Sequence, residues 1–416
     1  MDTITEPTLQ LNEQNTKEKI FKILKLSVPT LMGIFIFLNP FPHTTSIKEI
    51  CFYGSVIIVL ILIYFKKIDF PFKSPLTLPF ALFTAWAFIG LFFALDKGNS
   101  LHDFYAHLLK YMVLYYILIN FFNSRNRLIG LSWVIIISAT IFSIGEIYYF
   151  YFILGNSFSA KLVTGLPEIP VNWIGYITVS AAILSLHYII TASNLYVKAI
   201  SFIPLFPLCT LSILTQARSA VLALFLSVII LCFKNKKILV VCLGIMLIVT
   251  AMTPIKNRFI HANPIIGLRL DIHRTTIEVI KDFPIIGIGF GMETYRNGNV
   301  INLDIFNKRI SPKYRQDFIH NDPHSMPFSI AVRTGLIGFA LFLYILFISF
   351  KMCWNCIRHG TDDFITRWGR CVASVFVAVI VIGIFEPFFS HVPEVIFYTT
   401  FAMMTILWHL NKADSF

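Results

Sequence analysis

Charged residues are scarce in this sequence. They make up 13% of its 416 residues, whereas 56% are hydrophobic and the mean hydropathy is +0.74. A soluble domain is about one quarter charged, so this chain has too few polar side chains to cover a globule of its size. The composition excludes an ordinary soluble domain and indicates that lipid covers much of the surface. The formal charge of +12 then indicates basic loops that set the membrane topology, and no nucleic-acid partner.

Three further signals are missing. No internal repeat is evident, and the seven cysteines do not form a disulfide framework. Cys353 and Cys356 form a CxxC pair, but no second pair of ligands accompanies them, so a zinc or redox site is not indicated. The first nineteen residues are polar, and no small-residue cleavage site follows the first apolar segment. We therefore expect a disordered tail followed by a signal anchor.

Long apolar segments fill most of the chain. A membrane-spanning helix needs about 20 predominantly apolar residues. The sequence therefore predicts an all-α, polytopic integral membrane protein with about twelve transmembrane helices. The predicted spans are 22–41, 48–65, 76–95, 105–122, 129–154, 172–192, 198–215, 218–233, 238–254, 326–350, 371–389 and 393–410.

Lysine and arginine gather in alternate loops, which predicts that those loops and both termini are cytoplasmic. The predicted organisation is a cytoplasmic tail at 1–21, spans one to nine at 22–254, a large extracytoplasmic loop at 255–325, spans ten to twelve at 326–410 and a cytoplasmic tail at 411–416.

The large loop carries ten Lys and Arg against seven Asp and Glu. Long loops cross the membrane largely regardless of charge, so this basic character suits an anionic ligand. A helix is predicted at 269–282, ended by Pro284 and by the glycine-rich turn 287–291. The nucleotide-binding fingerprint needs a strand before its glycines and a helix after them. Here the predicted helix precedes the glycines, so the segment is interpreted as a tight turn.

Arginines at the outer surface are the first candidate site residues. Arg218 lies between two spans, where it opposes the positive-inside pattern, and its planar donors suit phosphate. An equally open interpretation is that the side chain of Arg218 extends into the lipid headgroups and binds no substrate. Arg269 and Arg274 lie five residues apart on the predicted loop helix, so only one is expected to point into a site. Asp271 or Glu278 would pair with the other.

Two histidines precede span ten. His320 and His324 flank Asp322. Histidine titrates near neutral pH, so its side chain can accept a proton from an attacking hydroxyl. A metal site is the less favoured alternative, because Pro323 interrupts any continuous helix there.

Ionisable residues also fall within or beside the spans. Lys110 and Glu146 lie inside predicted spans, where they could pair structurally or line a transport path. Four more lie near the outer ends of spans and could border a cavity: Asp103, Glu386, His391 and Glu394.

Several of these residues together resemble the O-antigen ligase family. His324-Ser325, nine residues and Gly335-Leu-Ile-Gly338 are similar to that family's histidine motif, whereas His320 fails the spacing. Arg218 with Leu222 is similar to its R-x-x-x-L motif, and Gln216 also matches. The segment from Arg269 to Gly289 resembles its loop helix. His273 and Arg333 depart from the family pattern and could alter the acceptor surface.

The resemblance implies a glycosyltransferase of the bacterial inner membrane. It implies an undecaprenyl-diphosphate-linked glycan as donor, lipid A–core as acceptor, and an active site that faces the periplasm. Arg218 and Arg269 would bind the diphosphate and His324 would activate the acceptor hydroxyl, with inversion and with no metal or cofactor. Gln216, Arg274 and Ser325 are further substrate-binding candidates, and His320 and Lys110 are secondary ones.

Two other functions remain open at this point. An O-antigen polymerase, or another transferase with the same donor and a different acceptor, would have similar motifs. A transporter with twelve spans is a third possibility, although the halves show no repeat.

Overall fold

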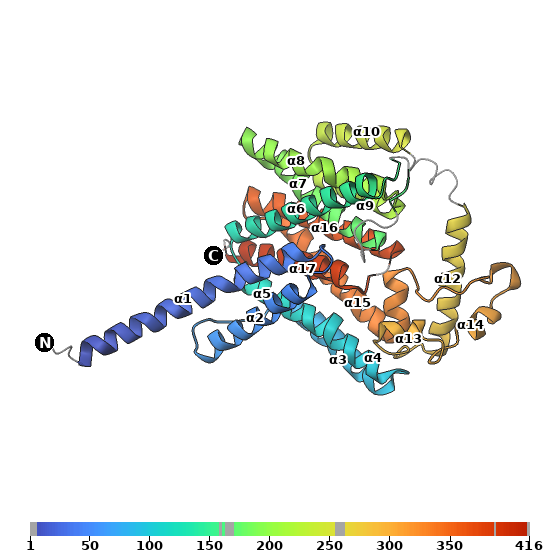
Figure 1. Cartoon of the computed structure of the whole chain (residues 1–416), viewed down its shortest axis with the longest axis horizontal. Helices are drawn as coiled ribbons and strands as arrows, with labels where there is room; N and C mark the ends of the chain where they lie inside the picture. Colours follow the sequence, from blue (N-terminus) through green and yellow to red (C-terminus); the bar gives the residue numbers. More distant parts are fainter. Residues whose placement is uncertain (1–5, 158–159, 163–169, 254–262, 387, 414–416) are drawn as a thin grey trace.

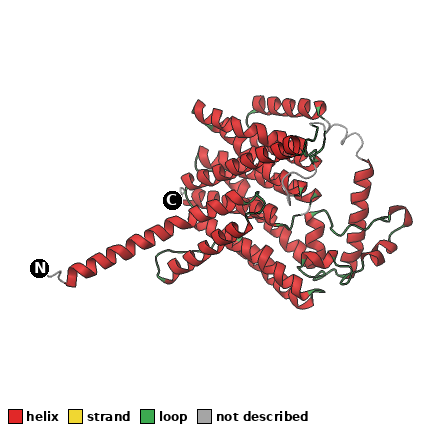
Figure 2. Cartoon of the chain, viewed as in Figure 1, coloured by secondary structure: helices red, strands yellow, loops and turns green. Residues whose placement is uncertain are grey.

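The chain is built from helices joined by turns (Figure 1, Figure 2). This computed structural model describes residues 6–157, 160–162, 170–253, 263–386 and 388–413, and no strand occurs within those ranges. The predicted all-α class is therefore confirmed. The beginning of the predicted loop and the outermost residues of both predicted tails lie outside the described residues.

The helices fall into a bundle and a group of loop helices. The bundle contains α1 (Glu6–Leu38), α2 (Thr45–Tyr64), α3 (Thr77–Phe93), α4 (Lys97–Asp103), η1 (Phe104–Leu109), α5 (Lys110–Phe121), α6 (Arg125–Ile147), η2 (Tyr148–Ile153), α7 (Val171–Thr191), α8 (Leu195–Leu214), α9 (Arg218–Cys232), α10 (Lys236–Met252), α15 (Met326–Arg358), α16 (Asp363–Phe385) and α17 (His391–Ala413). The loop helices are α12 (Asn263–Asp282), α13 (Met292–Arg296), α14 (Leu303–Arg309) and η3 (Pro312–Tyr314).

Eight helices in the described ranges are long and apolar enough to cross a membrane. They are Thr16–Leu38, Thr45–Tyr64, Lys97–Phe121, Arg125–Ile153, Trp173–Thr191, Leu195–Leu214, Met326–Arg358 and Asp363–Phe385. The shorter apolar helices α3 and α9 occupy two more of the predicted spans. The chain is thus a multi-pass membrane protein, and the count of twelve spans stays a prediction.

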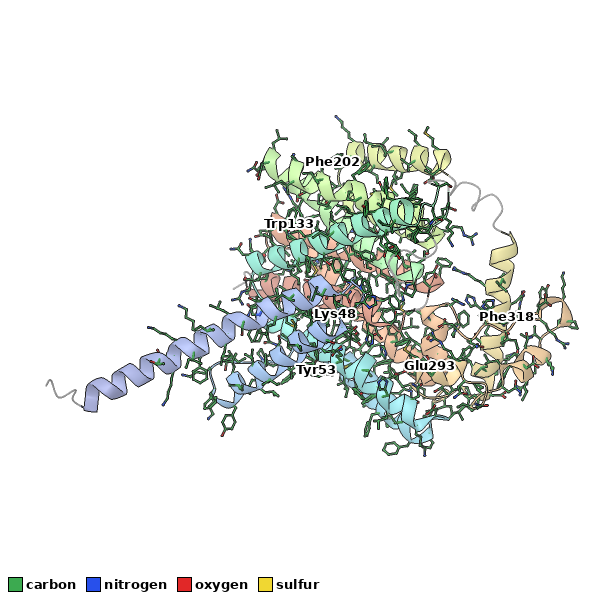
Figure 3. All side chains as sticks on the ribbon, in the orientation of Figure 1. Lys48, Tyr53, Trp133, Phe202, Glu293 and Phe318 are labelled. Atoms are coloured by element: carbon green, nitrogen blue, oxygen red, sulfur yellow. The ribbon has the colours of Figure 1, made fainter. Side chains whose placement is uncertain are left out.

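The most buried spans lie at the centre of the bundle. The most apolar window of α7 is 78% buried and that of α16 is 67% buried, against 22% for α1 and 28% for α8. The outer helices expose apolar side chains such as Phe202, which is 63% exposed on α8 (Figure 3). Exposed apolar faces of this extent suit contact with lipid.

The loop helices gather at the end of the bundle opposite the protruding start of α1 (Figure 1). There α12 packs against α14 and α15, and α13 packs against α4. The predicted loop helix ends at Asp282 as expected before Pro284, but it begins earlier, at Asn263. This group of elements, residues 263–325, is called the loop layer below.

The polar start of the chain differs from its prediction. Helix α1 begins at Glu6, so the first span continues backward through residues expected to be disordered. Glutamate, glutamine and lysine are good helix formers. Polar composition therefore does not stop a helix that an apolar span has already nucleated.

Candidate functional site

A sharp turn presents Arg218 at the start of α9. Gln216 has a φ of 51°, a left-handed conformation that is uncommon outside glycine. Helix α9 begins at Arg218, and its N-cap residue, Ala217, offers no side-chain cap to the first backbone N–H groups. Those groups carry the positive end of the helix dipole. An arginine at the start of an uncapped helix is an arrangement suited to an anion.

Helix α12 brings Arg269 to the same place. Nη2 of Arg269 donates a hydrogen bond to Oε1 of Glu386 at 3.0 Å, and Oγ of Ser219 donates to that same oxygen at 3.3 Å. The side chain of Glu386 is 8% exposed and that of Arg269 is 30% exposed. Glu386 directly follows α16, so its carboxylate joins α12, the first turn of α9 and the end of α16.

The third segment at this site, after the start of α9 and helix α12, is the turn that leads into α15. His324 has a φ of 49°, and its backbone N–H donates to Oδ1 of Asp322 at 2.7 Å. The other carboxylate oxygen of Asp322 accepts from Nη2 of Arg296 at 3.1 Å. Both carboxylate oxygens of Asp322 therefore accept hydrogen bonds from the protein, so this side chain is poorly placed to bind a metal together with the neighbouring histidines. The turn also confirms that Pro323 prevents a continuous helix across this motif.

Charge and burial both act on His324. Burial lowers its pKa below the usual 6.5, and the nearby positive charge of Arg269 lowers it further, whereas Asp322 opposes the shift. Arg269 also contributes to a lowered pKa at His273, where burial is again the largest cause. Arg269 thus lies close enough to act on both histidines. A neutral imidazole at neutral pH follows, and a neutral imidazole can accept a proton.

A junction of glycines marks the point where α15 bends. Gly287 and Gly335 have φ values of 78° and 69°, and the N–H of Leu336 donates to the carbonyl of Pro284 at 2.7 Å. A Cβ on Gly287 would lie 2.6 Å from the amide nitrogen of Gly335, and one on Gly335 would lie 2.0 Å from the carbonyl oxygen of Ile285. The two glycine motifs therefore pack against one another, and the predicted tight turn is confirmed.

The two residues that depart from the family pattern are both partly or fully buried. Arg333 is 3% exposed, donates to the carbonyl of Phe290 and lies over the ring of Phe389 at 3.8 Å. Arg333 therefore contacts buried groups of the interior and does not face an acceptor surface. The ring of His273 stacks on Phe328 at 4.4 Å, so it packs α12 against the start of α15.

Other candidates point elsewhere. Arg274 pairs with Asp271 and lies 3.8 Å from the ring centroid of Tyr314, so only Arg269 of that pair turns toward Glu386. Lys110 pairs with Glu49 on α2, away from the loop layer, and not with Glu146.

Two candidates lie beside His324. His320 lies next to His324, with ring centroids 5.8 Å apart. Ser325 is the N-cap of α15 and is 2% exposed.

Two contributors were not assigned to the site from the sequence. Glu386 was noted only as an acid near the outer end of a span, although it is the common partner of Arg269 and Ser219. Lys161 contributes favourable charge at Glu386 and comes from a loop that had no recognised motif. The one available signal was a carboxylate followed by proline at the end of a long apolar run.

The comparison with known families covers the middle of the chain. Residues 203–343 match the family model described as O-antigen ligase. No curated protein matches the chain. The matched segment contains Arg218, Arg269, His324 and the Gly335 break, whereas Glu386 lies beyond it.

Proposed function

We propose that this protein transfers a glycan from undecaprenyl diphosphate to lipid A–core, because residues 203–343 match the family model described as O-antigen ligase. The family indicates a ligase or polymerase type of glycosyltransferase, with a lipid-linked glycan and a lipid acceptor as its general partners. The observation that carries the proposal is the convergence of Arg269 and the start of α9 on Glu386, with His324 within electrostatic reach of Arg269.

The diphosphate of the donor would bind between Arg218 and Arg269. Two guanidinium groups can each hold phosphate oxygens in a bidentate manner. The uncapped backbone N–H groups at the start of α9 add further donors. Glu386 keeps Arg269 turned toward α9 before the donor arrives. These fixed donors stabilise the negative charge that grows on the leaving diphosphate.

His324 would accept the proton of the acceptor hydroxyl. As that oxygen forms a bond to the anomeric carbon, the bond from this carbon to the diphosphate oxygen breaks. The electron pair leaves with undecaprenyl diphosphate, and the proton goes to the imidazole. Attack from the side opposite the leaving group inverts the anomeric centre. Two arginines can neutralise the leaving group, so this scheme requires no metal.

The distribution of Lys and Arg along the chain supports a location for the proposed site. The alternation of Lys and Arg supports an orientation with both termini in the cytoplasm and the loop layer in the periplasm. The donor and the acceptor would then meet at the outer face of the bacterial inner membrane. Gln216 lies just before α9 and Ser325 just before α15, and both are proposed to contact the glycan or the diphosphate.

Complementation tests the proposal. The gene, and its His324→Ala variant, would be expressed in a strain that lacks its own ligase and makes a matched donor and core. The expected result is a ladder of core-linked O-antigen on a lipopolysaccharide gel with the natural sequence, and none with the variant at equal protein level.

Absence of the ladder, with the natural protein inserted in the membrane, would contradict the ligase assignment. The same gene would then be placed in a strain that lacks its O-antigen polymerase. Recovery of long glycan chains there would assign polymerase activity instead.

A further inference from the structure

A second cluster of chemically active side chains lies apart from Arg218, Arg269 and His324. His107 lies on η1, and His391 and Glu394 lie three residues apart on the first turn of α17. Nδ1 of His107 lies 2.7 Å from Oε2 of Glu394, and the rings of His107 and His391 have centroids 4.7 Å apart. One candidate ligand atom from each residue lies within 4.8 Å of the others. We propose that these three residues bind one zinc ion that clamps α17 to the rod formed by η1 and α5.

The ligand set fits zinc better than other common ions. Two imidazoles and one carboxylate form a known zinc set, usually with a fourth position open to solvent. Calcium and magnesium prefer cages made of oxygen atoms, which this cluster does not supply. Zn–N bonds of about 2.0–2.1 Å place tetrahedral ligand atoms about 3.3 Å apart. A modest closure of the trio would therefore reach zinc geometry.

Glu394 gives an independent reason to expect a ligand. It is 0% exposed, and among the described residues its Oε1 atom has no hydrogen-bond partner. A buried carboxylate oxygen without a partner is costly. A cation held between Oε1 and the two imidazoles would satisfy that oxygen.

The surroundings already orient one of the ligands. The hydroxyl of Tyr111 forms a hydrogen bond of 2.8 Å with Nδ1 of His391. An outer partner of this kind fixes the tautomer and leaves the other ring nitrogen, Nε2, as the metal ligand. His107 lies in a π-helical turn, a distortion that frequently occurs at functional sites.

Neighbouring charges do not occupy the site. Lys110 is paired with Glu49, and Asp103 accepts from the backbone N–H of Met292. The charge of Arg333 also acts on His107 and Glu394, but its guanidinium donates to the carbonyl of Phe290 and lies against the ring of Phe389. Lys48, which is labelled in Figure 3, acts on His391 through its charge from the first turn of α2. Glu394 is therefore the carboxylate available to offset the charge of the ion. The other two protein ligands would be the neutral imidazoles of His107 and His391.

The clamp would steady one side of the transferase site. Helix α17 follows Glu386 and Phe389 after a short connection, and Phe389 packs on Arg333. Fixing the first turn of α17 would limit the movement of this connection. The ion, with a water molecule as its fourth ligand, would hold α17 in place and take no part in glycan transfer, so the proposal does not depend on the identity of the glycan or the acceptor.

The test measures metal content and not transfer. The full chain would be purified in detergent from zinc-supplemented cells, and zinc would be measured by plasma mass spectrometry. About one zinc per chain is expected for the natural sequence and for the controls His320→Ala and His359→Ala. Loss to background is expected for His391→Ala and Glu394→Gln. His391 is exposed, so its loss should leave the protein folded and monodisperse.

A second measurement uses cobalt as the probe. Chelator-treated natural protein should regain thermal stability and develop a tetrahedral Co²⁺ spectrum on titration with Co²⁺, whereas His391→Ala should do neither. Equal zinc in the natural protein and in both cluster variants, or no cobalt spectrum in the natural protein, would overturn the proposal. The trio would then be a hydrogen-bonded network without metal.

Discussion

Nη2 of Arg269 lies 3.0 Å from Oε1 of Glu386, and this pair joins a helix of the loop layer to the end of a buried span. The same carboxylate oxygen accepts from Ser219 at the start of α9. The pair thus sets the orientation of the one arginine in α12 that turns toward α9.

Replacement of Arg269 should abolish transfer, and replacement of Arg274 should not. We expect Arg269→Ala to lower the rate by about 100-fold or more, because removal of one donor to a developing oxyanion costs about that much. Arg274→Ala is the matched control on the same helix, since Arg274 pairs with Asp271 and lies over Tyr314. Core-linked O-antigen would be quantified at equal membrane levels of both proteins. Equal loss in the two variants would contradict the separation of their roles.

Arg218 should tolerate lysine poorly. A lysine supplies a point charge and no planar fork, so it cannot bind a diphosphate in a bidentate manner. Arg218→Lys is expected to stay within about tenfold of the activity of Arg218→Ala, both about 100-fold below the natural protein. Transfer rates at saturating donor would decide this. Near-normal activity with lysine would reduce the role of Arg218 to long-range charge.

The rate should fall only at acidic pH. Burial, reinforced by Arg269, lowers the pKa of His324 below 6.5. The base form of His324 is therefore dominant at neutral pH, and activity is lost as the pH falls through that lowered pKa. A rate profile from pH 8 to pH 5 should be flat above pH 6.5. A midpoint above 6.5 would show that His324 is not the titrating base.

His324 and His320 should also separate by substitution. General base catalysis typically contributes about 10²–10⁴ in rate, so His324→Ala should lose at least about 100-fold. His320→Ala should retain most activity, because its spacing to Gly335 is wrong for the motif. Comparable loss in both variants would favour joint action of the two histidines.

The glycine junction should be intolerant of any side chain. A Cβ on Gly335 would lie 2.0 Å from the carbonyl oxygen of Ile285, at a positive φ. Overpacking typically costs about 1–3 kcal/mol, so Gly335→Ala should lower the melting temperature and the membrane level. Gly298→Ala is the control, since a Cβ there meets nothing within 4 Å. Equal melting temperatures would refute the close packing of the two glycine motifs.

The sequence predicted those features that depend on local chemistry. Pro284 and the glycines after it marked the end of α12 and the following turn, because proline and glycine act on the backbone where they stand. The spacing of Arg269 and Arg274 predicted that the two side chains would point in different directions, and Arg269 indeed pairs with Glu386 whereas Arg274 pairs with Asp271.

The features that escaped prediction depend on tertiary contacts. Glu386 lies 117 residues from Arg269 along the chain, and no local pattern connects them. The burial of Arg333 between aromatic rings was missed for the same reason, since sequence alone did not show which face of α15 meets Phe290 and Phe389.

Transfer by pure protein in detergent tests the transferase assignment most directly. The reaction would contain an undecaprenyl-diphosphate-linked glycan, lipid A–core and EDTA, with core-linked glycan and free undecaprenyl diphosphate measured together. We expect equal amounts of both products with the natural protein and neither product with Arg269→Ala, since no metal takes part in the chemistry and no sealed membrane is needed. Transfer that requires added Mg²⁺ or Mn²⁺ would contradict the metal-free mechanism, whereas loss restored by Zn²⁺ alone would reflect the proposed clamp on α17. An inactive natural protein that moves the lipid-linked glycan across sealed vesicles would contradict the transferase assignment.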